Sequence, residues 1–239
     1  MNNIHRIIGG ATALAFIPAL AFAQVQLPAD HVDLGIGYEA GALELHWHVE
    51  EPAPGVEYAP DEAYAFIPLS STITRPGGVA WDFTGALDGE TLFVAPGTDQ
   101  TPTVLFLGVG SEEITDGTFQ SDSLVFSLDG VTGPGVFSLW QTDGFGTPTA
   151  ALSSVSGGPT SFSLTTGGHA HYDWGFTAPG VYELTFTVSG TLVGETLPIA
   201  DTATYTFAVG TAIPEPSSFA ALAGLATLAL AATRRRRAV

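Results

Sequence analysis

Residues 168–190 decide the fold class, and they read GHAHYDWGFTAPGVYELTFTVSG. Apolar and polar side chains alternate along both halves of this stretch. Such alternation is typical of β-strands, because successive side chains point to opposite faces of a sheet. A Pro-Gly pair at 179–180 separates the halves and indicates a turn. The pattern predicts one strand over 169–176 and a second over 181–189.

Short runs of the same kind continue along the chain, separated by Gly, Pro and Asp-Gly pairs. In the clearest of them, Leu43, Leu45, Trp47 and Val49 share one face, opposite Glu44, His46, His48 and Glu50. No stretch between residues 24 and 210 has convincing helical periodicity. The remaining expected strands cover 31–37, 63–74, 91–95, 103–108, 123–128, 136–141, 161–165 and 202–209.

The turn between the two halves of the opening stretch resembles a corner found in immunoglobulin-like domains. In that corner a tyrosine hydroxyl caps the turn before a late strand, and Tyr182 follows Ala178-Pro179-Gly180 here. The expected fold class is therefore all-β, with a single immunoglobulin-like antiparallel β-sandwich over residues 24–210. We expect an N-terminal signal helix and a C-terminal hydrophobic helix to flank this ectodomain.

Residues 1–23 have the three parts of a secretory signal peptide. Arg6 charges the first part, residues 7–20 form an apolar run, and Ala21 and Ala23 give the small-x-small pattern that signal peptidase requires. We expect cleavage after Ala23, with signal peptidase as a partner. A transmembrane anchor is the alternative, and the short run, broken at Pro18, argues against it.

Residues 211–239 have the pattern of a sorting and anchoring tail. Pro214-Glu215-Pro216-Ser217 precedes an apolar run over 219–232, which ends at Arg234-Arg235-Arg236-Arg237. The arginines should keep this end in the cytoplasm, because Lys and Arg mark the cytoplasmic side of membrane segments. A buried helix of a soluble core is the alternative, and four consecutive arginines argue against it.

These three parts, in this order, resemble the PEP-CTERM sorting signal. The resemblance implies processing by an exosortase-type membrane protease in a Gram-negative bacterium that makes exopolysaccharide. The expected route is export across the inner membrane, transient anchoring in it, and final placement at the cell surface or in the extracellular matrix.

The charge between the two ends is strongly negative. Residues 24–213 carry 23 acidic side chains and one basic side chain, Arg75, for a net charge of −22. This charge argues against nucleic acid as a partner and suits divalent cations or a hydrated exopolysaccharide matrix. The chain contains no cysteine, which excludes disulfides, thiolate metal sites and cysteine catalysis.

Three stretches of the ectodomain resemble the choice-of-anchor M family of surface proteins. They cover residues 31–34, 107–114 and 168–182, and the last is also similar to a repeat of actinobacterial surface-anchored proteins. Asn often precedes the Trp of that repeat, whereas Asp173 stands there in this chain. Some family members resemble partners of metal-type ABC transporters, which implies metal handling.

The five histidines beyond the signal peptide fall in three short motifs, His31-x-Asp33, His46-x-His48 and His169-x-His171-x-Asp173. On a strand, residues i and i+2 project from the same face. If the two His-x-His pairs lie on neighbouring strands, they can give four imidazoles to one Zn²⁺ or Cu²⁺, with Asp33 or Asp173 as a further ligand or support. Separate surface histidines and a structural hydrogen-bond network are the alternatives.

The sequence gives weaker indications of Ca²⁺ binding and of enzymatic activity. The Asp-Gly pairs at 88, 116, 129 and 143 are turn formers first, and they lack the ligand spacing of a Ca²⁺ loop. Glu112 and Glu113 are adjacent, so we interpret them as part of a solvated face. No nucleophile elbow or dinucleotide motif occurs, and we expect no enzyme.

The leading hypothesis is therefore a non-enzymatic component of the cell envelope or exopolysaccharide matrix. A Zn²⁺- or Cu²⁺-binding surface protein is the main alternative. A carbohydrate-active or Ca²⁺-binding module is the second.

Overall fold

The computed structural model describes residues 24–53 and 55–213. The expected signal peptide and sorting tail, with Ala21, Ala23, the motif 214–217 and the arginines 234–237, lie outside the described residues. Over residues 24–53 and 55–213, no helix is long and apolar enough to cross a membrane.

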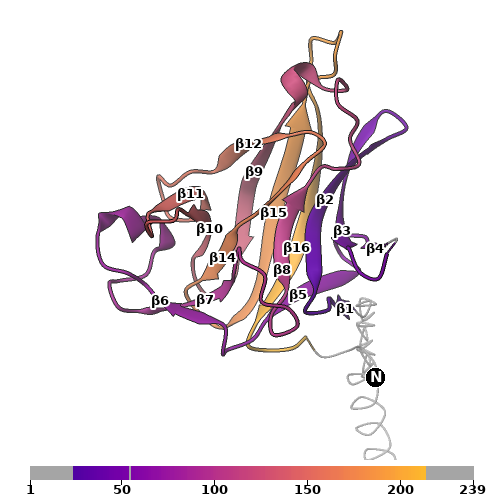
Figure 1. Ribbon diagram of the computed structural model, residues 1–239. Helices are drawn as coiled ribbons and strands as arrows, with labels where there is room; N and C mark the ends of the chain where they lie inside the picture. The colour runs from indigo at the N-terminus through magenta and orange to yellow at the C-terminus, as the bar shows by residue number, and fades with distance from the viewer. Residues whose placement is uncertain (1–23, 54, 214–239) are drawn as a thin grey trace, which may run out of the picture.

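The described residues form three β-sheets and two short 3-10 helices, η1 (Val79–Thr84) and η2 (Gln120–Asp122). The main sheet has the strand order β1 (Val25–Gln26), β5 (Ala63–Ile67), β16 (Ile199–Val209), β15 (Gly180–Gly190), β9 (Ser123–Thr132) and β12 (Ser161–Thr165). Its long strands β9, β15 and β16 run side by side in Figure 1.

The other two sheets have five strands each. The side sheet has the order β11 (Pro148–Ser153), β10 (Phe137–Thr142), β14 (Asp173–Phe176), β7 (Thr91–Ala95) and β6 (Thr72–Thr74). The sheet that we call the histidine sheet has the order β13 (His169–His171), β8 (Phe106–Gly110), β2 (His31–Glu39), β3 (Ala42–Val49) and β4 (Val56–Tyr58).

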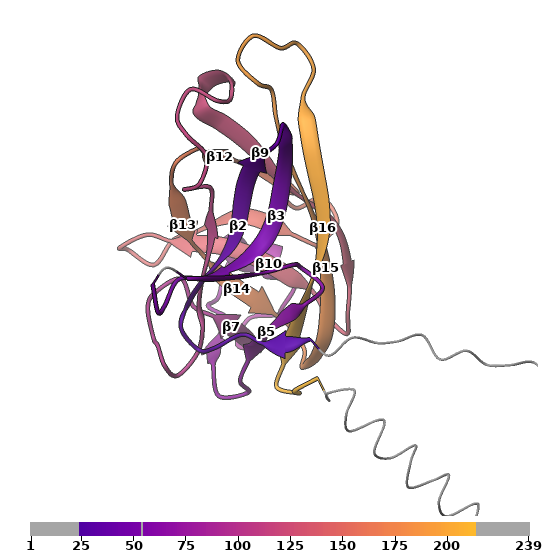
Figure 2. The same cartoon turned by 90° about the vertical axis from the view of Figure 1, so that its right-hand side faces the viewer.

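The histidine sheet packs one face against the main sheet, and Figure 2 shows β2 and β3 beside β15 and β16. Trp47 of β3 is fully buried, and its ring centroid lies 4.7 Å from that of Tyr205 and 5.7 Å from that of Phe207. The alternation expected for this strand is confirmed, because Leu43, Leu45, Trp47 and Val49 are all buried. The polar side chains of the same strand therefore project from the opposite face.

The tyrosine corner has the geometry expected of residues 178–182. The hydroxyl of Tyr182 donates a hydrogen bond of 2.8 Å to the carbonyl of Ala178. Gly180 has a φ of 137°, a value that non-glycine residues rarely adopt. The corner thus leads the chain into β15, which pairs with β9 and β16 along its length.

The all-β class is confirmed, and the arrangement differs in detail from a single antiparallel sandwich. The structure has three sheets, and β1 with β5, β5 with β16, and β2 with β8 pair in parallel. The single strand expected over 169–176 is two strands, since the chain leaves the histidine sheet after β13 and enters the side sheet as β14. β11 lies in a stretch for which the sequence predicted no strand.

Candidate metal centre

The outer face of the histidine sheet gathers all five histidines of the described residues. Register explains this, because residues paired across neighbouring strands project from the same face. Two rows of paired residues cross β13, β8, β2 and β3 in that order. The first row is His171, Gly108, Asp33 and His48. The second row is His169, Gly110, Gly35 and His46. His31 precedes Asp33 by two residues and therefore joins this face.

Glycines make room on this face for side chains that lie flat across the sheet. A Cβ atom at Gly35 would stand 2.3 Å from Nε2 of His46, and one at Gly108 would stand 2.1 Å from Oδ1 of Asp33. At Gly110 it would stand 3.4 Å from Oδ2 of Asp33. Asp33 thus leans across β8 toward β13, over a floor that only glycine allows.

Three imidazoles meet at the edge of this floor, those of His31, His169 and His171. Their ring centroids lie 4.8 to 5.7 Å apart, and one nitrogen of each lies within 4.8 Å of the others. The Nε2 atoms of His31 and His171 are 3.1 Å apart. Two nitrogens bound to one tetrahedral Zn²⁺ at about 2.0–2.1 Å are separated by roughly 3.3 Å, so this spacing fits shared coordination.

Asp33 lies beside these imidazoles, and it forms a close group of possible ligands with His169 and Glu112. It is 1% exposed, and neither of its oxygens has a partner among the described residues. Its Oδ2 lies 3.7 Å from Nε2 of His31. Burial raises the pKa of Asp33 to about 6, and the nearby His31 and His169 partly oppose the rise. A carboxylate that is ionised while buried without a partner destabilises the folded protein, and a bound cation removes this destabilisation.

The protonation state of the His171 imidazole also suits metal binding. Burial lowers the pKa of His171 to about 4, and His31 and His169 act in the same direction. His171 is therefore neutral near pH 7 and keeps a lone pair for a metal. Phe106 stacks on its ring at 3.6 Å and fixes its orientation.

Glu112 supports His169 from outside the cluster. Its Oε1 accepts a hydrogen bond from Nδ1 of His169, which raises the pKa of His169 against the opposing effect of burial. A carboxylate on one ring nitrogen leaves the other free to ligate and makes it more basic. We call the set His31, His169, His171 and Asp33 the first cluster, with Glu112 as its supporting residue.

His46 and His48 form a second cluster with Glu113. Oε1 of Glu113 lies 3.6 Å from Nε2 of His46 and 3.5 Å from Nδ1 of His48. The structure thus divides the two His-x-His pairs between two clusters, because β13 and β3, which carry them, are not the neighbouring strands that a shared site required. Glu112 and Glu113 are exposed, as the interpretation of a solvated face expected, and each carboxylate also reaches a different histidine cluster.

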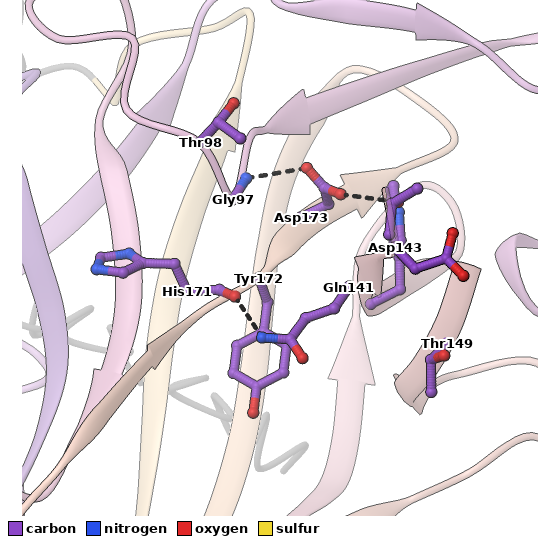
Figure 3. A pocket seen from close by; sticks show the side chains of 10 residues that line it. Gly97, Thr98, Gln141, Asp143, Thr149, His171, Tyr172 and Asp173 are labelled. Atoms are coloured by element: carbon purple, nitrogen blue, oxygen red, sulfur yellow. Dashed lines mark hydrogen bonds between the residues drawn. The ribbon is translucent and has the colours of Figure 1, made fainter. Parts of the chain in front are cut away.

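Asp173 lies apart from both clusters, in contrast to its expected role as a ligand or support. It starts β14, in a different sheet from His169 and His171. Its Oδ1 accepts a hydrogen bond of 2.9 Å from the amide of Gly97, and Figure 3 shows the His171 ring pointing away from it. Asp173 instead lines a cavity of about 440 Å³ with Gln141 and Tyr172.

Three of the four Asp-Gly carboxylates bond nearby backbone or side-chain groups. Oδ1 of Asp143 accepts hydrogen bonds from the amides of Phe145 and Thr147 at 2.9 and 2.8 Å, and these bonds lower its pKa. Asp88 pairs with the buried Arg75, and Asp129 bonds the hydroxyl of Thr187. Over residues 24–53 and 55–213, none of the four belongs to a group of three close metal-ligand side chains.

The sequence contained one overlooked signal for this site. Leu34-Gly35-Ile36-Gly37 and Leu107-Gly108-Val109-Gly110 place a glycine at every second residue of a strand, on the face that carries the histidines. Comparison with protein-family models, curated proteins and solved structures gave no match to this chain.

Proposed function

We propose that this chain is an exported, envelope-anchored β-sandwich protein that binds one Zn²⁺ or Cu²⁺ ion at the first cluster. The carrying observation is the carboxylate of Asp33, which is buried, has no hydrogen-bond partner within residues 24–53 and 55–213, and lies at the edge of the three imidazoles. His31, His169, His171 and Asp33 supply the four ligands, and Glu112 orients His169.

The donor set favours these ions over others. Imidazole suits Zn²⁺ and Cu²⁺, whereas Ca²⁺ prefers six to eight oxygen ligands. Four protein ligands complete a tetrahedral shell and leave no position for a substrate, which is typical of structural or storage sites and not of catalytic ones. The proposal is therefore binding without catalysis.

The envelope location is proposed from the two ends of the sequence. Residues 1–23 supply a signal-peptide pattern, and residues 211–239 resemble a PEP-CTERM tail. The immunoglobulin-like character of the ectodomain is proposed on the tyrosine corner at Tyr182. A net charge of −22 over residues 24–213 suits a protein that attracts cations at the cell surface or within exopolysaccharide.

Metal-dependent stability tests the proposal. Zinc at 100 times its dissociation constant stabilises a protein by about 2.7 kcal/mol, which raises Tm by about 5–10 °C for a domain of this size. Wild type should show this rise on addition of Zn²⁺ or Cu²⁺ to the chelator-treated protein. His171→Ala should lower this rise, because it removes a ligand of the first cluster, and Glu183→Gln on the remote strand β15 should leave it unchanged. Absence of any rise in wild type would refute the proposal.

A further inference from the structure

We infer that the second cluster, His46, His48 and Glu113, is a second transition-metal position on the same face of the histidine sheet. It goes beyond the one-metal function proposed above, because none of its three side chains belongs to the first cluster. The ligand class is again a borderline divalent cation such as Zn²⁺ or Cu²⁺, since two of three donors are imidazoles.

The spacing of the donors is the first argument. One oxygen of Glu113 lies 3.6 Å from Nε2 of His46 and 3.5 Å from Nδ1 of His48. These separations are too long for hydrogen bonds. They are close to the roughly 3.3 Å that separates two ligand atoms on one tetrahedral Zn²⁺. The three atoms therefore surround a point that a metal ion can occupy.

The buried imidazole of His46 is the second argument. His46 is 6% exposed, and its Nε2 has no hydrogen-bond partner among the described residues. A buried polar nitrogen without a partner destabilises the folded state. This nitrogen faces the oxygen of Glu113, so a cation between them satisfies both groups.

Glycines of the sheet lie beneath the ligands of the second cluster, as they do beneath Asp33 in the first cluster. Gly35 lies under the His46 ring, and a Cβ atom at Gly37 would stand 3.2 Å from Oε2 of Glu113. Side chains at these positions would push both ligands off the sheet. The alternate glycines of β2 thus serve the second cluster, as those of β8 serve the first.

The two positions adjoin one small cavity. It has a volume of about 30 Å³, which is room for a water molecule or a single ion. Asp33 lines it from the first cluster, and His48 and Glu113 line it from the second. The carboxylate of Asp33 lies against the glycines of β8, and the cavity offers a place for a fourth ligand of the second metal. A water or small anion can complete the shell there.

The adjacent residues Glu112 and Glu113 link the two positions through one peptide bond. Glu112 supports His169 in the first cluster, while Glu113 ligates in the second. Their divergent side chains give each metal position its own carboxylate from the same short segment after β8.

Zinc stoichiometry tests this inference on the full chain, purified in a non-ionic detergent and stripped with a chelator. Calorimetric titration with ZnCl₂ should give two equivalents for wild type, one for His48→Ala and one for Glu113→Gln. His48 is only partly buried, and Glu113 is more exposed still, so these variants disturb packing less than a change at His46. Glu183→Gln is the matched control and should keep two equivalents.

The outcomes separate the two proposals. One equivalent in wild type that persists in both His48→Ala and Glu113→Gln would overturn the second position and leave the first intact. No binding in wild type would overturn both. If His48→Ala fails to fold by circular dichroism, Glu113→Gln alone decides, because it changes a half-exposed side chain by a single atom.

Discussion

Replacement of Asp33 by Asn should stabilise the metal-free protein and abolish binding at the first cluster. Asp33 is 1% exposed, and burial raises its pKa from the ordinary 3.8 to about 6. A rise of this size corresponds to about 3 kcal/mol of free energy that the folded state loses when the carboxyl ionises. Asn has nearly the same shape and carries no charge, so it escapes this cost.

The sign of the pH dependence follows from the direction of the shift. Below pH 3.8 the carboxyl is protonated in both folded and unfolded chains and contributes no difference. Between pH 3.8 and about 6 the folded chain holds the proton more tightly, so its stability falls as pH rises. Above about pH 6 the full penalty applies. The advantage of Asp33→Asn is therefore largest near neutral pH and vanishes near pH 4.

Thermal unfolding in EDTA measures this advantage. A gain of about 3 kcal/mol raises Tm by roughly 6–12 °C for a domain of this size. Asp33→Asn should exceed wild type by this amount at pH 7.5 and match it near pH 4, while Glu183→Gln should match wild type at both values. With Zn²⁺ at 1,000 times its dissociation constant, which stabilises wild type by about 4.1 kcal/mol, the order should reverse at pH 7.5. Equal Tm values of the variant and wild type at pH 7.5 in EDTA would refute the reasoning.

Four further predictions concern the floor, the supporting carboxylate, the buried cation and the tail. Gly108→Ala should lose Zn²⁺ affinity by at least about tenfold in calorimetry, because its Cβ atom would meet Asp33, whereas Gly144→Ala, which meets nothing within 4 Å, should not. Glu112→Gln should weaken the same binding by about 10–100-fold without changing the number of ions bound. Arg75→Ala should lower the free energy of unfolding in urea by about 2–4 kcal/mol, because it removes a buried guanidinium that bonds two carboxylates. Deletion of residues 214–239 should leave a folded protein that cell fractionation finds released instead of membrane-bound.

The sequence predicted the strands whose two faces differ in polarity. The alternation in β3 is strong because Trp47 and its apolar neighbours must face the main sheet, which leaves His46 and His48 on the other side. The corner before β15 was also predictable, since its chemistry lies within five residues. These features depend on local pattern, which a single sequence displays.

The grouping of the histidines could not be predicted, because it depends on which strands become neighbours. β8 joins β2 in parallel and brings β13 beside it, so His169 and His171 meet His31 instead of His46. The position of Asp173 away from the histidines also depends on strand neighbours, because Asp173 begins β14 in another sheet. The indole of Trp174 bonds the carbonyl of Leu107, and Asp173 bonds Gly97, so the chain changes sheets between His171 and Asp173.

The most direct test of the first cluster is zinc K-edge X-ray absorption of the His48→Ala chain, which lacks the second metal position, loaded with one equivalent of Zn²⁺. The proposal predicts four light-atom neighbours at about 2.0–2.1 Å, with the outer-shell scattering of three imidazoles. A shell of six oxygens without imidazole scattering would contradict it, because such an ion would be held by surface carboxylates and water.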